Sequence, residues 1–266
     1  MSDIFINQTY KVYQSNQSIQ FSDHQVDFLR LSIAKFIYQQ YIATTGDIIH
    51  RYHNYQAIYD ELNIKLENIS QSKYNIHYII IKGPFILKNL FIFINTNQNN
   101  QNNLNSIILS RLVNLEIKIG QYFLKLLENL PDLNIPWIIQ NCKINNIESI
   151  INKLFAKISS YGDFIISYNL NHFDINSNLR KIKLTIPEPD LKNLNLDQQP
   201  ILSSINQFLY STTKIKFENL SIVEFYSGLI NIINDGKFRI NGEKLLNLDD
   251  NTKKESVWLI IESLVS

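Results

Sequence analysis

A long hydrophobic pattern, around which the rest of the chain is expected to pack, runs through residues 104–130. Its apolar side chains recur at alternating steps of four and three residues: Ile108, Leu112, Leu115, Ile119, Tyr122, Leu126 and Leu130. At about 100° per residue, this spacing places them in one stripe along an α-helix. A second apolar stripe widens the arc. A helix that is apolar over so much of its circumference needs neighbours on several sides, so the pattern predicts a central buried helix over 104–130.

Two residues stand out on this predicted helix. Glu116 falls inside the apolar arc, and Gly120 follows one turn later. A buried carboxylate is costly unless it is paired or protonated, and a glycine lets a ligand or another backbone approach closely. Glu116 and Gly120 are therefore the candidate ligand-binding residues. The alternatives are that Glu116 forms a structural ion pair with an Arg or Lys of a neighbouring element, or that the helix is rotated enough to expose it.

The N-terminal half contains further helical and strand patterns. Ser22 or Asp23 is a good N-cap for a helix that ends at Gly46, and a second apolar stripe predicts another helix over 48–69. The short joint between them predicts an antiparallel helical hairpin. Residues 74–82 and 85–95 are rich in β-branched and aromatic side chains, and Gly83-Pro84 between them predicts a turn.

The C-terminal half has shorter patterns. We expect helices over 146–158, 201–209, 221–233 and 253–264, paired strands over 164–170 and 179–186, and a small β-ribbon around 237–240. Helices and strands occur in clusters without regular alternation, which predicts an α+β fold in which an antiparallel helical hairpin and a central buried helix pack with short, mostly antiparallel strands. The proline-containing segment 187–200 suggests an N-terminal α+β core over 1–186 and a smaller C-terminal helical subdomain with the ribbon over 187–266, or one continuous domain.

Composition narrows the classes of partner. Lys and Arg number 25 against 24 Asp and Glu, for a net charge of +1. No global field therefore attracts the chain to nucleic acid or to an anionic membrane, and no apolar run approaches the ~20 residues of a membrane span. We expect a protein partner, with neither a membrane span nor a nucleic-acid partner.

The residue usage also bears on origin and compartment. Cys142 is the only cysteine, which excludes an intramolecular disulfide and fits a reducing compartment. The heavy use of Ile, Asn, Lys, Tyr and Phe is typical of an AT-rich genome. These features suggest a soluble protein of the plastid stroma or the cytoplasm, encoded by an organelle or an endosymbiont.

No catalytic signature is present. The chain has no GxxxxGK[ST], GxGxxG, HExxH or GxSxG motif. Asp47, His50 and His53 resemble metal ligands at first, but they lie on the polar side of their predicted helix and lack a second ligand pair. The sequence therefore predicts no catalytic residue, no metal site and no cofactor.

One segment near the C-terminus resembles a known module. Residues 229–245, with Gly236, Ile240, Asn241 and Gly242, resemble the closing half of the S4 RNA-binding module, in which a helix is followed by Gly and by a strand that ends in Val-Asn-Gly. The preceding segment lacks the arginines that contact RNA in that family. The resemblance implies Lys237, Arg239 and Lys244 as candidate phosphate contacts, and the alternative is an ordinary β-ribbon.

Three functional hypotheses follow. The first is a non-enzymatic interaction, assembly or accessory protein, because catalytic motifs are absent while Tyr and Asn are abundant. The second is an enzyme or a small-ligand-binding protein with a site near Glu116. The third is an RNA-associated protein that uses the C-terminal ribbon.

Overall fold

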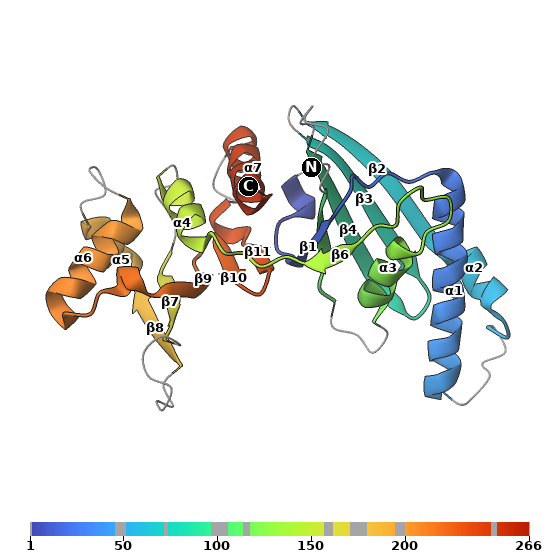
Figure 1. The fold of residues 1–266 in the computed structure, drawn as a ribbon, viewed down its shortest axis with the longest axis horizontal. Coiled ribbons are helices and arrows are strands. Elements are labelled where there is room, and N and C mark those ends of the chain that lie inside the picture. Colours follow the sequence, from blue (N-terminus) through green and yellow to red (C-terminus); the bar gives the residue numbers. More distant parts are fainter. Residues whose placement is uncertain are drawn as a thin grey trace. The chain divides into compact units, whose positions relative to one another are not determined.

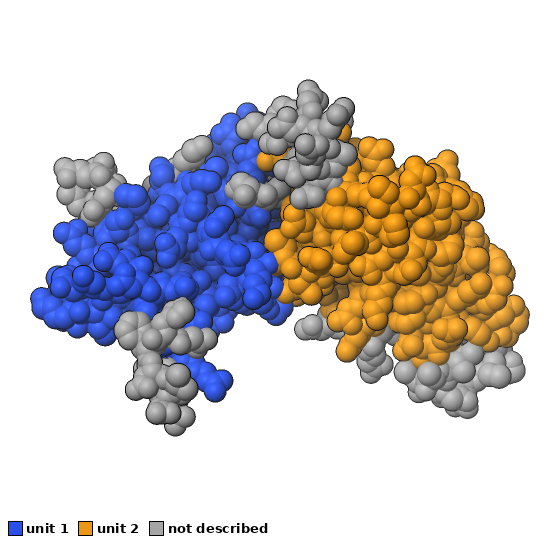
Figure 2. All heavy atoms as spheres, viewed as in Figure 1, with its two compact units in different colours: residues 1–9, 143–266 blue, residues 10–142 orange. Residues whose placement is uncertain are grey.

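The chain folds as two compact units. The computed structural model describes residues 2–45, 52–71, 74–96, 106–113, 118–156, 162–170, 180–194, 200–245 and 249–265. One unit comprises residues 10–142, and the other comprises residues 143–266 together with residues 1–9 (Figure 2). We call them the 10–142 unit and the 143–266 unit; the boundary predicted between residues 186 and 187 falls inside the latter. Each unit combines helices with antiparallel strands, so the fold class is α+β.

The 10–142 unit is a twisted antiparallel sheet with helices on one side (Figure 1). Its elements are β1 (Thr9–Ser15), α1 (Asp23–Thr45), α2 (Tyr55–Glu61), β2 (Asn63–Gln71), β3 (Tyr74–Gly83), β4 (Ile86–Thr96), β5 (Ser106–Arg111), α3 (Ile119–Glu128) and β6 (Ile139–Asn141). The strands follow the order β2-β3-β4-β5-β1, and β6 pairs with β1. The predicted strands on either side of Gly83-Pro84 form the β3–β4 hairpin.

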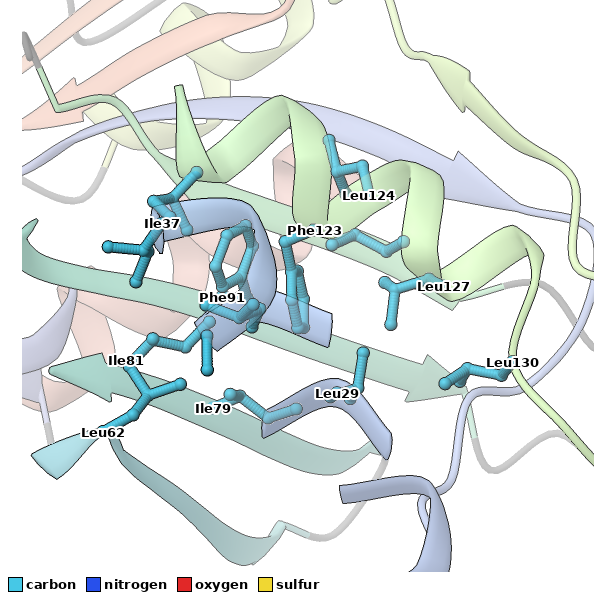
Figure 3. Close-up of a cluster of buried hydrophobic side chains, with 14 of the residues drawn as sticks. Leu29, Ile37, Leu62, Ile79, Ile81, Phe91, Phe123, Leu124, Leu127 and Leu130 are labelled. Carbon is cyan, nitrogen blue, oxygen red and sulfur yellow. The ribbon is translucent and has the colours of Figure 1, made fainter. Parts of the chain in front are cut away.

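The core of this unit lies between the sheet and the helices α1 and α3. Figure 3 shows Phe123 and Leu127 of α3 and Leu29 of α1 converging on the sheet. The rings of Phe91 in β4 and Phe123 have centroids 4.1 Å apart, and both side chains are fully buried. Burial of one such side chain contributes about 1.5–3 kcal/mol, so this layer is the main source of the unit's stability.

The predicted central helix over 104–130 is wrong in its first part. Residues 106–111 form strand β5, and the helix α3 begins only at Ile119. The strand is buried on both faces, so its side chains form a nearly continuous apolar run in which helical and strand spacing cannot be told apart. Strands β4 and β1 pair with β5 on its two edges. These neighbours form hydrogen bonds with the backbone N–H and C=O groups of β5, which favours a strand over a helix here. Glu116 lies outside the described residues.

The second helix is also shorter than the pattern predicts. The helix α2 has seven residues, is capped by the Asn54 side chain, which accepts from the Ala57 amide, and ends at Leu62. From Asn63 onward the chain forms β2, which pairs with β3 along its whole length. The predicted helical hairpin is therefore reduced to the long α1 followed by the short α2, because pairing with β3 outweighs the helical stripe of 62–69.

In the 143–266 unit, antiparallel strands pack against helices. Its helical elements are η1 (Ser2–Ile4), α4 (Ile147–Phe155), α5 (Glu188–Asn193), α6 (Ile201–Thr213), η2 (Phe217–Asn219), η3 (Glu243–Leu245) and α7 (Asp250–Val265). Its strands are β7 (Phe164–Asn169), β8 (Lys181–Ile186), β9 (Ser221–Tyr226), β10 (Ile230–Ile233) and β11 (Lys237–Ile240), in the order β8-β7-β9-β10-β11. The helix α4 packs on β9 and contacts α6 and α7. Within the described residues, no helix has the length and hydrophobicity that crossing a bilayer requires.

The predicted helix over 221–233 is two strands in the structure. Strands β9 and β10 pair with each other around a turn at Ser227, whose hydroxyl accepts from the amides of Leu229 and Ile230. In β9, Ile222 and Phe225 are buried and Glu224 is half-buried. Because no helix precedes Gly236, the resemblance to the S4 RNA-binding module does not extend to the structure of this segment.

Candidate functional site

A pocket opens beside Gly120 in the 10–142 unit. Its volume is about 270 Å³. Four elements of the unit line it: the strands β1 and β4, the end of β5, and the first turn of α3. Their contributions to the wall are Tyr13, Asn89, Ser110, Arg111, Leu112, Val113, Lys118, Ile119, Gly120 and Gln121. Of the two ligand-binding residues expected from the sequence, Gly120 thus lies at a pocket, and Glu116 lies outside the described residues.

The sheet register places three polar side chains on the same side of this pocket. Ser110 lies opposite Phe91 of β4, and Tyr13 lies opposite Ile108 of β5. Because alternate residues of a strand share a face, Ser110, Tyr13 and Asn89 all project from the face that α3 covers. Ser110 and Asn89 are each 4% exposed, so their polar groups are positioned by the folded sheet.

The hydroxyl of Ser110 faces the helix where Gly120 lacks a side chain. A Cβ atom on Gly120 would lie 3.7 Å from Ser110 Oγ. Within the described part of the chain, this hydroxyl has no hydrogen-bond partner. Ser110 lines the pocket, so its hydroxyl can exchange a hydrogen bond with a ligand that enters it.

The described residues that line the pocket carry positive charge. Arg111 and Lys118 are the only charged residues among the described residues that line it. Arg111 donates from Nη1 to the Lys88 carbonyl at 3.1 Å, which leaves its other N–H groups available. The ammonium of Lys118 has no ion-pair partner in the described ranges. Two cations without a neighbouring described acid favour an anionic group in this space.

The start of α3 adds to this positive potential. The helix begins after Lys118, whose side chain makes no capping hydrogen bond. The amides of Ile119, Gly120 and Gln121 point out of the first turn and have no acceptor among the described residues. The helix dipole places partial positive charge at the same point, so the amides and both cations act in the same direction.

Tyr13 stays neutral in this environment. Burial raises the pKa of its phenol above 10.0, because the charged form would be poorly solvated. Its hydroxyl is therefore a hydrogen-bond donor at physiological pH. The described lining offers hydrogen-bond donors and positive charge, and within it no nucleophile has an activating base.

The candidate phosphate contacts of the C-terminal ribbon are not brought together as one cationic group. Lys237 Nζ lies 2.6 Å from Asp235 Oδ2, and Lys244 Nζ lies 3.4 Å from Glu188 Oε2. Arg239 is exposed and has no ion-pair partner in the described part of the protein. Only Arg239 of the three therefore keeps an uncompensated charge.

Sequence reasoning missed three residues of the pocket near Gly120. The single long helix predicted over 104–130 places Ser110 about 80–100° around the axis from Arg111 and Lys118, so it does not bring the three side chains to one site. The strand signal was present in the β-branched residues Ile107 and Ile108, but it could not be separated from a buried helix without knowing the neighbouring strands.

We also considered metal binding and thiol chemistry among the described residues. No three His, Cys, Asp or Glu residues in the described ranges are grouped so as to hold a metal ion. Cys142 is half-buried, and burial raises the pKa of its thiol, so the thiolate needed for nucleophilic chemistry is disfavoured. Of the histidines weighed as ligands, His50 lies outside the described residues.

Comparison with known proteins adds no family to this picture. The chain matches no protein-family model, and no curated protein is significantly similar to it.

Proposed function

We propose that the protein is a non-enzymatic binding protein whose 10–142 unit holds a small anionic ligand, a phosphate or a carboxylate, in the pocket beside Gly120. The observation that carries the proposal is the composition of the described wall: both charged residues, Arg111 and Lys118, are cations, and they flank an uncapped helix start. Backbone amides at a helix N-terminus bind anions readily.

The near-buried hydroxyl supports the same ligand class independently. Ser110 is 4% exposed, lines the pocket and has no partner among the described residues. A phosphate or carboxylate oxygen accepts a hydrogen bond from such a hydroxyl, and the same oxygen is attracted by Lys118. The ligand would therefore give this hydroxyl a hydrogen-bond partner that no described residue provides.

The size of the pocket limits the ligand. A volume of about 270 Å³ lies just below the ~300–1,000 Å³ of pockets that bury drug-sized molecules. Inorganic phosphate, a phosphate monoester or a short dicarboxylate fits this space, and a dinucleotide does not.

The test is a titration of the full chain with inorganic phosphate, followed by amide chemical shifts and by calorimetry. Binding shifts the amide signals of residues 118–121. Lys118→Gln weakens binding by about 10-fold or more, because a hydrogen bond to a charged group contributes ~1.5–3 kcal/mol. Lys125→Gln is the matched control, since it removes the same charge from α3 about 10 Å further along the helix, and it changes the affinity less than twofold.

Two further arms identify the anion and expose a failure. The same titration with malonate distinguishes a carboxylate from a phosphate site, because the preferred anion saturates at lower concentration. Equal losses in Lys118→Gln and Lys125→Gln would mean that binding depends on net charge alone. If neither anion shifts the amides of 118–121, the proposal is wrong.

A second candidate function is protein interaction, as expected from the composition. It is supported by large apolar side chains that stay exposed around the end of α6: Phe208 is 57% exposed, Tyr210 45% and Ile215 44%. Apolar exposure of this kind is enriched where proteins associate. Sedimentation of the pure chain tests self-association through this segment: Phe208→Ser is expected to reduce it, and a chain that stays monomeric at all concentrations argues against it.

A further inference from the structure

The exposed face of the second sheet carries a different arrangement of charge and aromatic surface. The 143–266 unit buries one face of its sheet, where Phe164, Phe225, Ile232 and Phe238 are at most 2% exposed. A pocket of about 500 Å³ opens on the opposite side. It is larger and more open in character than the pocket near Gly120, and its lining residues belong to different elements.

Strand register places the central residues of this pocket in one row across the sheet. Arg239 pairs with Asn231, Asn231 with Tyr226, and Tyr226 with Ile165. On β8 the row ends at Thr185, which pairs with Ile165. Lys183 lies two residues before Thr185 on the same strand and therefore projects from the same face. Because paired residues share a face, the ring of Tyr226 lies in the middle of the row, with a cation on each side.

The two cations are uncompensated. Lys183 and Arg239 are exposed, and neither has an ion-pair partner among the described residues. Their neighbours on the same face differ: Lys181 pairs with Glu224 at 2.5 Å, and Lys237 pairs with Asp235 at 2.6 Å. Lys183 and Arg239 are therefore the cations of this face that lack a described ion-pair partner. They are opposed by Glu243, which also lines the pocket. Burial, together with the nearby carboxylates of Glu224 and Asp235, raises the pKa of the Tyr226 phenol.

The spacing of the cations selects among anionic ligands. Adjacent strands lie ~4.8 Å apart, so the Cα atoms of Lys183 and Arg239, on the outermost strands of five, are roughly 20 Å apart. One phosphate cannot be held at both positions. A chain of phosphates with a planar group between them matches two separated cations with an aromatic ring in the middle.

The pocket is preorganised by hydrogen bonds. Asn241 donates from Nδ2 to the Ser227 carbonyl at 2.9 Å and to Asn231 Oδ1 at 3.1 Å. The amide of Gly242 donates to Asn7 Oδ1 at 2.9 Å. A Cβ on Gly242 would lie 2.6 Å from Ile6 Cγ2, so this close approach requires glycine. The polar side chains beside Tyr226 are thus held in place by the fold.

We propose that this face of the 143–266 unit binds a short segment of single-stranded nucleic acid, with a base stacked on Tyr226 and flanking phosphates at Lys183 and Arg239. Stacking accepts any base and the cations contact only the backbone, so binding is not sequence-specific. The two cations and the net charge of +1 for the whole chain make this a weak interaction with a shallow salt dependence, since few phosphates are neutralised.

The test is fluorescence anisotropy of the full chain with a labelled uridylate oligomer of about eight nucleotides, within the range of single-strand site sizes. Two phosphate contacts predict that the logarithm of the association constant falls by roughly 1.4 for each tenfold rise in salt concentration. Arg239→Gln and Lys183→Gln each weaken binding and each reduce this slope by about half. Lys254→Gln, which removes an exposed charge from α7, is the control and leaves binding unchanged.

The stacking contact has its own variants. Tyr226→Leu weakens binding at least about fivefold. Tyr226→Phe keeps the aromatic ring, so this variant binds the oligomer as tightly as the unchanged protein. Glu243→Gln strengthens binding, because it removes a negative charge from the pocket.

Several outcomes would overturn the proposal. One is the absence of saturable binding at low salt, and another is a loss in Lys254→Gln equal to that in Arg239→Gln. A duplex of the same length that binds as tightly as the single strand would exclude the stacked base. Should Tyr226→Leu fail to fold, the exposed Arg239→Gln and the ring-preserving Tyr226→Phe still decide the matter.

Discussion

The hydroxyl of Ser110 and the missing side chain of Gly120 face each other across the pocket of the 10–142 unit. A Cβ added to Gly120 would lie 3.7 Å from Ser110 Oγ, an ordinary contact distance. Gly120 also has a backbone conformation that other residues adopt, since it is absent from the residues with positive φ. Neither space nor backbone strain therefore requires a glycine at this position, and the property it contributes is the room beside Ser110.

Gly120→Ala should accordingly stabilise the protein and weaken binding of the ligand. Alanine in a helix is more stable than glycine by up to ~1 kcal/mol, and the added methyl group occupies part of the proposed anion site. We expect a higher urea midpoint in equilibrium unfolding and a lower affinity for phosphate in calorimetry.

Gly242→Ala is the contrasting variant for this experiment. Its Cβ would lie 2.6 Å from Ile6 Cγ2 and 2.8 Å from Asn7 Nδ2, so it should destabilise the 143–266 unit by about 1–3 kcal/mol through overpacking. A Gly120→Ala protein that loses stability as Gly242→Ala does would show that the first turn of α3 is tighter than described.

Asn95→Ala should be among the more destabilising single substitutions in the 10–142 unit. The Asn95 amide is 3% exposed, donates to the Ile19 carbonyl at 3.0 Å and accepts from the Ile19 amide at 3.3 Å and from the Ser106 hydroxyl. Removing it leaves buried polar groups of Ile19 and Ser106 with fewer partners, at a cost of about 2–4 kcal/mol. Urea unfolding followed by circular dichroism measures the loss.

The exposed Asn141 is the matched control for that variant. Asn141→Ala removes the same amide from the surface of β6 and should change the free energy of unfolding by less than ~0.5 kcal/mol. Equal effects of the two substitutions would contradict the role assigned to the buried amide.

The stability of the start of α7 should depend on pH through the carboxyl group of Asp249. Its carboxylate accepts from the Thr252 hydroxyl at 2.6 Å and from the amides of Thr252 and Asn251, each at 3.0 Å. These bonds, the Thr252 hydroxyl first, lower the pKa of Asp249 below its ordinary 3.8. Because the folded-state pKa is depressed, the stabilisation is complete above the unfolded-state value and disappears as pH falls through the folded-state value.

A carboxyl titration by NMR measures this shift directly. Thr252→Val removes the largest contributor and should move the pKa of Asp249 back toward 3.8. Asp249→Asn should lower the melting temperature at pH 6 and make no difference at a pH below the folded-state pKa. A melting-temperature difference that persists unchanged into that acidic range would rule out the charged cap as its cause.

The outcome for the candidate site shows where sequence reasoning stopped. Gly120 was identified from its place in an apolar pattern, although the long helix assigned to that pattern is a strand followed by a short helix. Ser110 and Lys118 could not be associated with it, because their proximity depends on β5 lying beneath the first turn of α3. In the ribbon, Arg239 was named as a cation, but its relation to Lys183 depends on strand pairing across the whole second sheet.

Local chemistry by itself determined α1, the β3–β4 hairpin, α4, β7 with β8, and α7, because each carries a cap, a turn or a periodicity that only one backbone conformation satisfies. Residues 62–69, 106–111 and 221–233 were decided by the tertiary structure. Their apolar spacing suits a helix as well as a strand, and the free energy of each conformation depends on neighbours that the segment does not contain. Hydrogen bonds to adjacent strands and burial on the sheet selected the strand in all three, and the same pairing assembled both candidate binding surfaces.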